Sequence, residues 1–170
     1  MRNMRGSTLI ELLAVIAIAG VLASTAIPGL RGFLADQHEL ARTNAFVASV
    51  QLARSESLRR GRAVTLCASP DGHRCSGNLG AGWLVFTDDD DDGKLDAGET
   101  VLDVVGSELA GRVVTVRTRF TYRPFDRHST NGTVTFCHPQ DPQRSRAVVV
   151  SYTGRPRIAH RLPDGRPLPC

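Results

Sequence analysis

Aromatic side chains and lysine are scarce in this 170-residue sequence. Only 5% of the residues are aromatic, and Lys94 is the one lysine among 21 lysines and arginines. Few large rings leave a folded body with little apolar area to bury, so additional stabilising links are expected. The arginines favour partners with phosphate or carboxylate groups, which a guanidinium contacts in two places; a GC-rich genome would enrich arginine as well.

Catalytic signatures are also missing. The sequence contains no nucleophile elbow, no H-E-x-x-H zinc motif and no phosphate-binding loop. Its length excludes a barrel enzyme of about 250 residues, and its 41% hydrophobic content excludes a chain disordered throughout. Five residues that lie near acidic or hydroxyl groups are interpreted as ordinary loop residues: His73, His128, His138, His160 and Ser151. We therefore expect one globular unit with an appendage, and no enzyme.

One long hydrophobic run is present, near the N-terminus. Residues 7–27 (STLIELLAVIAIAGVLASTAI) carry a single charge, Glu11, and follow Arg2 and Arg5. About 20 apolar residues span a bilayer as a helix, and the preceding arginines keep the start in the cytoplasm. A secretory signal would have a shorter apolar core followed by small residues. Glu11 is costly inside a membrane, unless it reaches the headgroups from the helix start.

The helix is expected to continue past a kink at Pro28, because residues 30–58 repeat apolar positions at spacings of three and four. The stripe predicted to pack on the body comprises Leu30, Leu34, Ala41, Ala45, Ala48, Leu52 and Ser55, widened by Phe33, Leu40 and Val47. The predicted opposite face carries Arg31, Asp36, Glu39, Arg42, Arg54 and Glu56. Arg59, Arg60 and Gly61 indicate the helix end.

Short β-branched segments separated by Gly, Pro, Asn and Asp follow the helix. Such a pattern predicts antiparallel strands. The predicted strands are Ala63–Ala68, Trp83–Thr87, Thr100–Val105, Val113–Arg117, Arg119–Arg123, Thr133–Cys137 and Ala147–Thr153. A long helix followed by a strand-rich body belongs to the α+β class.

The N-terminal residues resemble a known processing signal. Gly6-Ser7-Thr8-Leu9-Ile10-Glu11-Leu12-Leu13 is similar to the cleavage and methylation signature of type IV pilins. The resemblance implies that a prepilin peptidase cuts between Gly6 and Ser7 and methylates Ser7, and that Glu11 pairs with a neighbouring subunit's N-terminal amine. Two opposite charges in lipid stabilise each other. Ser7 departs from the family, which usually has phenylalanine there, and a plain signal anchor is the alternative.

Later motifs narrow the resemblance. The ordered series SLRRGRAVTLCAS, GWLVFTD, a late cysteine and GRPR looks like the GspH/FimT branch of minor pilins, in its FimT- or FimU-like members. The implied fold is a long kinked helix packed on an antiparallel β-sheet domain. The implied divisions are a leader at 1–6, a transmembrane and assembly helix at 7–29, an amphipathic helix at 30–61 and a β-rich periplasmic domain at 62–170.

Four cysteines suit disulfides in an oxidising compartment. Cys67 and Cys75 flank a turn-rich segment, so a bridge between them would close a short loop. Cys137 would then pair with Cys170. Three connectivities are open from sequence alone. Zinc is disfavoured because the spacings are not C-x-x-C pairs.

An acidic run offers a candidate metal site. Its pattern matches the calcium motif D-x-D-x-D-G-x5-E, with Gly93 at the sharp turn and five candidate ligands: Asp88, Asp90, Asp92, Asp96 and Glu99. The flanks read as strands instead of the two helices of an EF-hand. A solvated acidic hairpin loop without metal is the favoured alternative, and no other cofactor is expected.

The C-terminal third is basic. Residues 112–166 hold 11 arginines against three aspartates, a local net of 11 − 3 = +8. Gly154-Arg155-Pro156-Arg157 follows a strand, and its alternate arginines can project together. With Arg161 and Arg166 they would bind the phosphates of double-stranded DNA without reading sequence. The resemblance to FimT-type members implies DNA capture in natural transformation. The alternative is an arginine cluster that pairs with an acidic loop of this or a neighbouring subunit.

We therefore expect a minor type IV pilin at or near the pilus tip that contributes to pilus assembly and to DNA uptake and is not an enzyme. Before assembly it is expected in the inner membrane with a periplasmic domain, and afterwards in the pilus at the cell surface. Expected partners are other pilins, the prepilin peptidase, the inner membrane and double-stranded DNA. The alternatives are a GspH-like pseudopilin of a type II secretion system and a purely structural, assembly-priming subunit.

Overall fold

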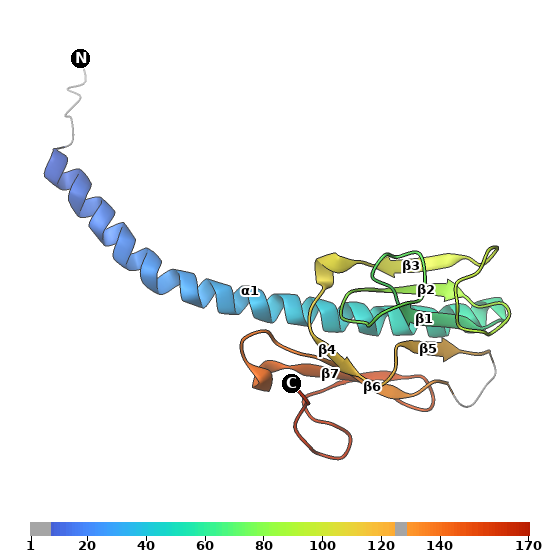
Figure 1. Ribbon diagram of the computed structural model, residues 1–170. Coiled ribbons are helices and arrows are strands. Elements are labelled where there is room, and N and C mark those ends of the chain that lie inside the picture. The colour runs from blue at the N-terminus through green and yellow to red at the C-terminus, as the bar shows by residue number, and fades with distance from the viewer. Residues whose placement is uncertain (1–7, 125–128) are drawn as a thin grey trace. The chain divides into compact units, whose positions relative to one another are not determined.

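The computed structural model describes residues 8–124 and 129–170, apart from the side chain of Pro28. The chain divides into two compact units, residues 1–35 and 36–170. One helix, α1 (Leu9–Arg60), runs through both and is followed by the strands (Figure 1). Its helical backbone continues through Pro28 without a break, and the kink at that residue stays a prediction. The helix ends as expected, with Arg59 and Arg60 in its last turn and Gly61 (φ 68°) beyond it.

The strands of the second unit form two antiparallel four-stranded sheets. The first has the order β3 (Val101–Val105), β2 (Trp83–Thr87), β1 (Val64–Ala68), β5 (Arg119–Tyr122). The second has the order β4 (Val113–Thr115), β6 (Gly132–Phe136), β7 (Arg146–Val150), β8 (Pro156–Ala159). Short 3-10 turns lie at Ser107–Leu109 and Pro142–Arg144. All seven predicted strands are present, but neither β8 nor the division into two sheets was predicted.

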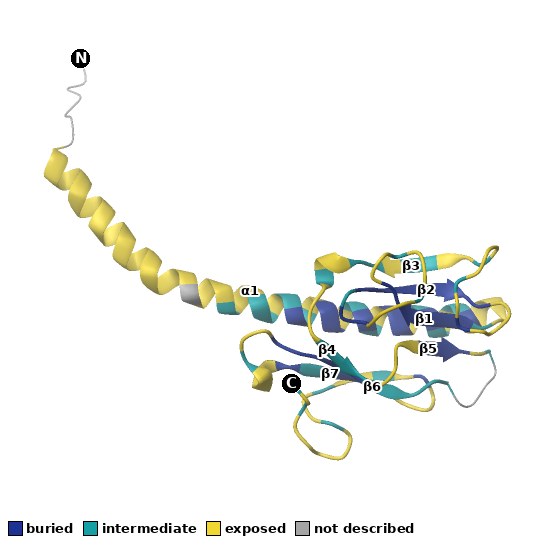
Figure 2. Cartoon of the chain, in the orientation of Figure 1, coloured by how far each residue is buried: buried dark blue, intermediate teal, exposed yellow. Residues whose placement is uncertain are grey.

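The core of the second unit forms around one aromatic side chain of α1. The Phe46 ring lies 5.5 Å from Trp83 on β2, 5.8 Å from Phe120 on β5 and 5.6 Å from Phe136 on β6, measured between ring centroids. A single helix residue therefore contacts both sheets, and edge-to-face pairs of this kind add to the area that they bury. Figure 2 shows the buried residues along β1, β2 and β5 and on the second half of α1. Trp83 also donates a hydrogen bond to Ser49 Oγ of α1 (3.0 Å).

The predicted packing face of α1 was wrong in part: Ala45 and Val47 pack against the core, but the most buried positions lie elsewhere. Ala41, Ala48 and Ser55 are exposed. The buried helix positions are instead Glu39, Arg42, Thr43, Phe46, Ser49, Val50, Ala53 and Ser57. These positions keep the same three- and four-residue spacing, so periodicity alone fits either face. The bulky Phe46 decides between them, because its ring fills the space between the sheets, and two charged side chains are buried as a consequence.

Two disulfides resolve the open connectivity. Cys67 is bonded to Cys75, across a separation of eight residues, and Cys137 is bonded to Cys170, across 33 residues. The first closes the loop that follows β1. The second ties the C-terminal segment to the end of β6, which is the pairing that the sequence favoured.

Candidate functional site

The N-terminus of α1 is closed by a reciprocal capping interaction. The Thr8 backbone N–H donates to Glu11 Oε2, and the Glu11 N–H donates to Thr8 Oγ1, both at 3.4 Å. This is a capping box, which satisfies two backbone donors that a helix start leaves unpaired. The distances are long for such hydrogen bonds, so the Glu11 carboxylate is held weakly. Gly6 and Ser7, the predicted cleavage and methylation residues, lie outside the described residues.

The first half of α1 presents an apolar surface within its own unit. Its exposed large side chains are Leu9, Ile10, Leu12, Leu13, Val15, Ile16, Ile18, Val21, Leu22, Ile27, Leu30, Phe33 and Leu34. By length and composition this helix can cross a membrane. Continuous apolar surface of this kind marks contact with lipid or with another protein.

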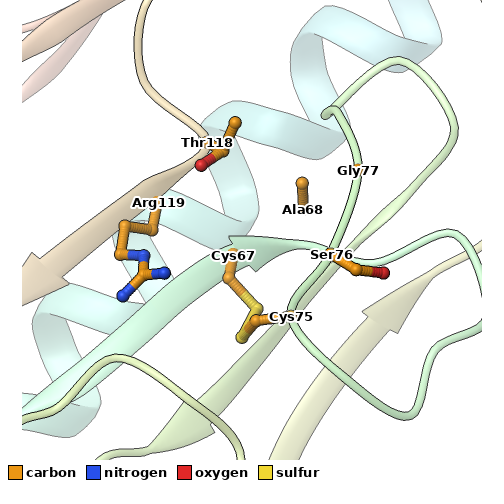
Figure 3. Close-up of a pocket in the computed structure, with 7 residues that line it drawn as sticks. All are labelled: Cys67, Ala68, Cys75, Ser76, Gly77, Thr118 and Arg119. Atoms are coloured by element: carbon orange, nitrogen blue, oxygen red, sulfur yellow. A yellow bond between two sulfur atoms is a disulfide. The ribbon is translucent and has the colours of Figure 1, made fainter.

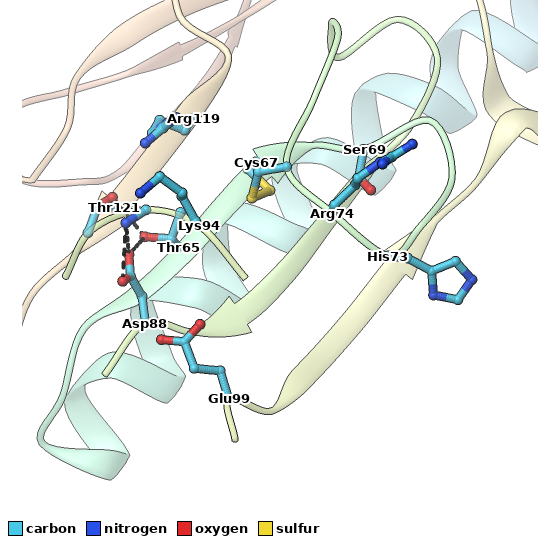
Figure 4. The surroundings of a disulfide bond; sticks show 12 residues. Thr65, Cys67, Ser69, His73, Arg74, Asp88, Lys94, Glu99, Arg119 and Thr121 are labelled. Carbon is cyan, nitrogen blue, oxygen red and sulfur yellow. Dashed lines mark hydrogen bonds between the residues drawn. A yellow bond between two sulfur atoms is a disulfide. The ribbon is translucent and has the colours of Figure 1, made fainter. Parts of the chain in front are cut away.

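Asp88, the first predicted calcium ligand, is a buried structural carboxylate. It directly follows β2 and is fully buried. Its oxygens accept hydrogen bonds from the Thr65 hydroxyl (2.5 Å) and from the Gly93 backbone N–H (3.1 Å to Oδ2). Thr65 in turn bonds Thr121 across β1 and β5 (2.8 Å), and Figure 4 shows this arrangement. Asp88 therefore fastens the acidic loop to the first sheet.

The other carboxylates of the loop have partners within the second unit. The two oxygens of Glu99 accept the backbone N–H groups of Asp89 (2.7 Å) and Asp96 (2.9 Å). Three ion pairs offset part of the negative charge of the loop: Arg62–Asp89 at 2.7 Å, Lys94–Asp92 at 2.6 Å and Arg123–Asp91 at 2.6 Å. The Lys94 ammonium lowers the pKa of Asp92 by its hydrogen bond.

The structure brings all five predicted calcium ligands together in two groups that share Asp90. Ligand atoms of Asp88, Asp90 and Glu99 lie within 4.8 Å of one another, as do those of Asp90, Asp92 and Asp96. Calcium takes six to eight oxygen ligands. Here Lys94 already pairs with Asp92, Arg62 and Arg123 pair with the neighbouring Asp89 and Asp91, and backbone donors occupy both Glu99 oxygens. Calcium binding stays a prediction, and the loop has the contacts to hold its shape without it.

We expect the full chain to unfold at nearly the same temperature in millimolar calcium and in excess chelator. A calcium site saturated about 100-fold would add about 2.7 kcal/mol and raise the melting temperature by roughly 4 °C or more. Differential scanning fluorimetry in neutral detergent, with magnesium as the control ion, measures the shift. A calcium-specific rise of that size that is lost in an Asp90→Asn variant would instead establish the ion site.

A small hollow lies beside the Cys67–Cys75 bond (Figure 3). It measures about 130 Å³ and is lined by Cys67, Ala68, Cys75, Ser76, Gly77, Thr118 and Arg119. Pockets that take small organic ligands have volumes of about 300–1,000 Å³. The hollow is therefore too small for a substrate, and Arg119 beside it donates instead to the Asp92 carbonyl of the acidic loop (3.2 Å).

The GRPR segment forms a locked turn and the start of an edge strand. The Ser151 N–H donates to the Arg155 carbonyl (3.1 Å), and the Gly154 N–H donates to the Ser151 carbonyl (2.9 Å). Gly154 has φ 71°, and a Cβ at this position would lie 2.6 Å from Tyr122 Cε1. Glycine is therefore required for both the turn and the close approach.

Four predicted DNA-binding arginines fall into two classes. Arg155 and Arg157 are exposed, and neither side chain has a hydrogen bond or ion pair within residues 8–124 and 129–170. By contrast, Arg161 donates to the Gly165 carbonyl (3.2 Å) and Arg166 pairs with Asp164 (2.6 Å). The Arg166 backbone N–H and guanidinium lower the pKa of Asp164. Arg155 and Arg157 are therefore the two of these four whose guanidinium groups have no partner among the described residues, whereas Arg161 and Arg166 each use part of their five donors.

The rest of the basic third is partly neutralised within the chain. Arg119 and Arg123 contact the acidic loop, as the alternative interpretation of the basic cluster anticipated for these two residues. Arg144 pairs with Asp36 of α1 (2.6 Å). The sequence-based charge of +8 therefore overstates the positive charge available to a ligand. Of the four arginines predicted to bind DNA, Arg155 and Arg157 remain the strongest candidates.

A buried charged pair escaped sequence reasoning. Glu39 and Arg42 lie one helical turn apart and are 1% and 2% exposed. The distance from Arg42 Nη1 to Glu39 Oε2 is 3.7 Å. The Arg42 guanidinium also sits over the Phe136 ring, 5.4 Å from its centroid. Burial raises the pKa of Glu39 to about 7, against the lowering effects of Arg42 and Arg146. The sequence signal that could have predicted their burial is their spacing of three and four residues from each other and from Phe46, which places all three on one helix face.

One of the predicted loop histidines has a structural role. His138 is 6% exposed, and its Nδ1 accepts the backbone N–H groups of Gln140 (3.2 Å) and Asp141 (3.0 Å). Its Nε2 lies 3.2 Å from Asp36 Oδ1. Ser151 belongs to the β7–β8 turn, His73 and His160 are exposed, and His128 lies outside the described residues.

Comparison with known proteins agrees with this architecture. A sequence profile for the family "Type II transport protein GspH" matches residues 42–154, and one for the prokaryotic N-terminal methylation motif matches residues 1–27. Two fimbrial proteins of Pseudomonas aeruginosa are each 27% identical over 124 residues, which are 68% of this chain and 80% of each relative.

Solved structures show the same fold. Two crystal structures of the type IV minor pilin FimU of Pseudomonas aeruginosa superpose with TM-scores of 0.51 and 0.52 at 19% identity. They cover 71% of this chain and 91% and 87% of FimU. The profile match over most of the chain, joined to the methylation motif and the pilin fold, shows that this chain belongs to the GspH family of minor type IV pilin-like proteins.

Proposed function

We propose that this chain is a minor subunit of a type IV pilus, anchored in the inner membrane with its β-rich domain in the periplasm and then incorporated at or near the pilus tip. The exposed apolar surface of residues 9–34 supports insertion into lipid and later contact with the helices of other pilins. The methylation motif supports cleavage by a prepilin peptidase between Gly6 and Ser7, and the fimbrial relatives favour a pilus.

Glu11 has a chemical reason to change partners on assembly. In the single chain its carboxylate caps α1 by accepting one long hydrogen bond from the Thr8 N–H, while the Glu11 N–H donates to the Thr8 hydroxyl. A neighbouring subunit's amine would offer an ion pair in low dielectric, where such an attraction is strong. We infer that Glu11 exchanges the cap for that amine when subunits pack together.

We further propose that the chain binds DNA through Arg155 and Arg157. The observation that carries this proposal is a pair of exposed guanidinium groups that have no partner in the described part of the chain, on a turn and edge strand that hydrogen bonds hold in place. Such groups bind phosphates without reading sequence, and the binding weakens steeply with salt because counterions are released. Natural transformation is the process in which a pilus component with this property would serve.

The double variant Arg155→Ala/Arg157→Ala should lose about tenfold in affinity for duplex DNA at low salt, because it removes two charge-assisted contacts. The slope of log K against log salt should become less steep by about two. Arg161→Ala/Arg166→Ala is the matched control: it removes the same charge from side chains with partners in their own chain. Gel shifts of the full chain in neutral detergent across a salt series measure both. Equal losses in the two variants would reduce the effect to net charge.

A pseudopilin of a type II secretion system is the second candidate, and the GspH family profile favours it. The two candidates differ in phenotype. Deletion of the gene should abolish pili and DNA uptake in the first case, and export of secreted enzymes in the second. Complementation with the Arg155→Ala/Arg157→Ala variant should then restore pili without restoring DNA uptake. A purely structural pilin would regain both.

A further inference from the structure

An exposed aromatic residue, Tyr152, lies in the segment that joins β7 to β8 and precedes Arg155 by three residues and Arg157 by five. Tyr152 follows β7 in the turn that leads to β8, and it is 66% exposed. Its side chain makes no hydrogen bond and no ring contact within residues 8–124 and 129–170. Aromatic residues are scarce in this sequence. In contrast to Tyr152, the core rings of the second unit are buried: Phe46, Trp83, Phe120, Tyr122 and Phe136. Packing therefore gives no reason for a tyrosine here.

The backbone fixes the place of Tyr152. Its carbonyl accepts the Ser129 N–H (3.0 Å), and the hydroxyls of Ser151 and Thr153 bond each other (3.0 Å) on either side of it. Ser151 Oγ also accepts the Arg155 N–H (3.2 Å). The turn thus holds Tyr152 three residues from Arg155, within about 11 Å between Cα atoms. The long arginine side chain spans much of that distance, so one strand of nucleic acid can contact both residues.

An exposed ring next to cationic side chains is the arrangement by which proteins bind unpaired nucleotides. Bases of a single strand stack on an aromatic ring while guanidinium groups contact the adjacent phosphates, and each stacked base contributes about 1–3 kcal/mol. A duplex hides the faces of its bases inside the helix, so a ring on a protein surface cannot stack on them. The two kinds of residue therefore respond differently to the two forms of DNA.

We propose that Tyr152 stacks on an unpaired base, so that the surface formed by Tyr152, Arg155 and Arg157 prefers single-stranded DNA to duplex DNA. This inference rests on the proposed DNA binding by the two arginines and names the form of DNA that the same surface takes. The phosphates supply the shared attraction, and the ring supplies the preference.

The test compares two probes on the full chain in neutral detergent: an oligothymidylate of about 20 nucleotides, longer than typical single-strand sites, and a relaxed, covalently closed circular duplex, which has neither ends nor unpaired loops. Tyr152→Ala should weaken binding of the single strand about 5- to 100-fold, the equivalent of losing one stacked base. Its binding to the closed duplex should stay within about twofold, because no base face is available there. Tyr152→Phe keeps the ring and should bind both probes as the unchanged chain does.

The possible results distinguish base stacking by Tyr152 from the other ways in which the variants could affect DNA binding. Undiminished single-strand binding by Tyr152→Ala, or equal losses on both probes, overturns base stacking. Loss in Tyr152→Phe assigns the contact to the hydroxyl and overturns it as well. If Arg155→Ala/Arg157→Ala binds both probes as tightly as the unchanged chain, the proposed DNA binding itself fails. Because Tyr152 is exposed, circular dichroism and thermal melts of its variants should match those of the unchanged chain.

Discussion

Replacing Arg42 with methionine should lower the free energy of unfolding by up to about 1.4 kcal/mol more at pH 8 than at pH 4.5, because the Glu39 carboxylate loses its partner and takes up a proton instead, at about 1.4 kcal/mol per pH unit above its folded pKa. Methionine fills much of the volume of the arginine stem. The loss of unfolding free energy therefore reflects the missing charge and not a cavity. Arg146 of β7 also acts on Glu39, and the Thr43 hydroxyl bonds it (3.4 Å), but neither replaces the adjacent guanidinium. Urea denaturation followed by tryptophan fluorescence from the buried Trp83 measures the change.

The effect of Arg42→Met depends on pH in a defined direction. Glu39 has an ordinary pKa of 4.5 and a pKa of about 7 in the fold, so the folded state holds this proton more tightly than the unfolded state. Stability from the protonated form is complete below pH 4.5 and is lost as the pH rises through 7. Removing Arg42 raises the folded pKa further, so the variant should lose little at pH 4.5 and most at pH 8.

Two further variants isolate the pair. Glu39→Gln added to Arg42→Met should recover much of the loss, because no buried charge remains. Arg59→Met removes an arginine from an exposed pair with Glu56 on the same helix and should leave the stability nearly unchanged at both pH values, because solvent screens such a pair. An Arg42→Met variant as stable as the unchanged chain at pH 8 would contradict the burial of this pair.

Removal of the Cys137–Cys170 disulfide, by serine at both positions, should cost about 3.5–4 kcal/mol, because its 33-residue loop restricts the unfolded chain strongly. The matched double variant at Cys67 and Cys75 opens a loop with a separation of eight and should cost about 1 kcal/mol less. Thermal and urea unfolding of both variants, with and without reductant, give the difference. Equal costs would show that native contacts, and not loop length, set the contribution of each bridge.

The same bridge bears on the proposed DNA-binding surface. Arg161 and Arg166 lie in the segment that Cys170 fastens, whereas β8 and its turn are held by pairing with β7. Opening the bridge should therefore leave binding by Arg155 and Arg157 intact at temperatures where the fold persists. The contrast separates a stabilising element from the ligand-binding one.

Local sequence determined the frame of the molecule, because its signals are short-range. The apolar run with Glu11 near its start, the helix end at Arg59, Arg60 and Gly61, and seven alternating segments each depend on neighbouring residues and are present as expected. The loop between Cys67 and Cys75 suited a local bridge for the same reason. β8 was missed because proline and glycine in GRPR favour a turn, and its strand forms only by pairing with β7.

Tertiary structure decided which charges are free, and that decision sets the candidate site. Asp88 in the calcium pattern is buried against Thr65, while Glu39 and Arg42, expected on the solvent face, are enclosed because Phe46 selects the other helix face. Of the four arginines proposed for DNA, two are bonded within their own chain and two are not. Sequence spacing fixes where a charge stands along the chain, but only packing brings distant groups together and determines whether that charge is already satisfied.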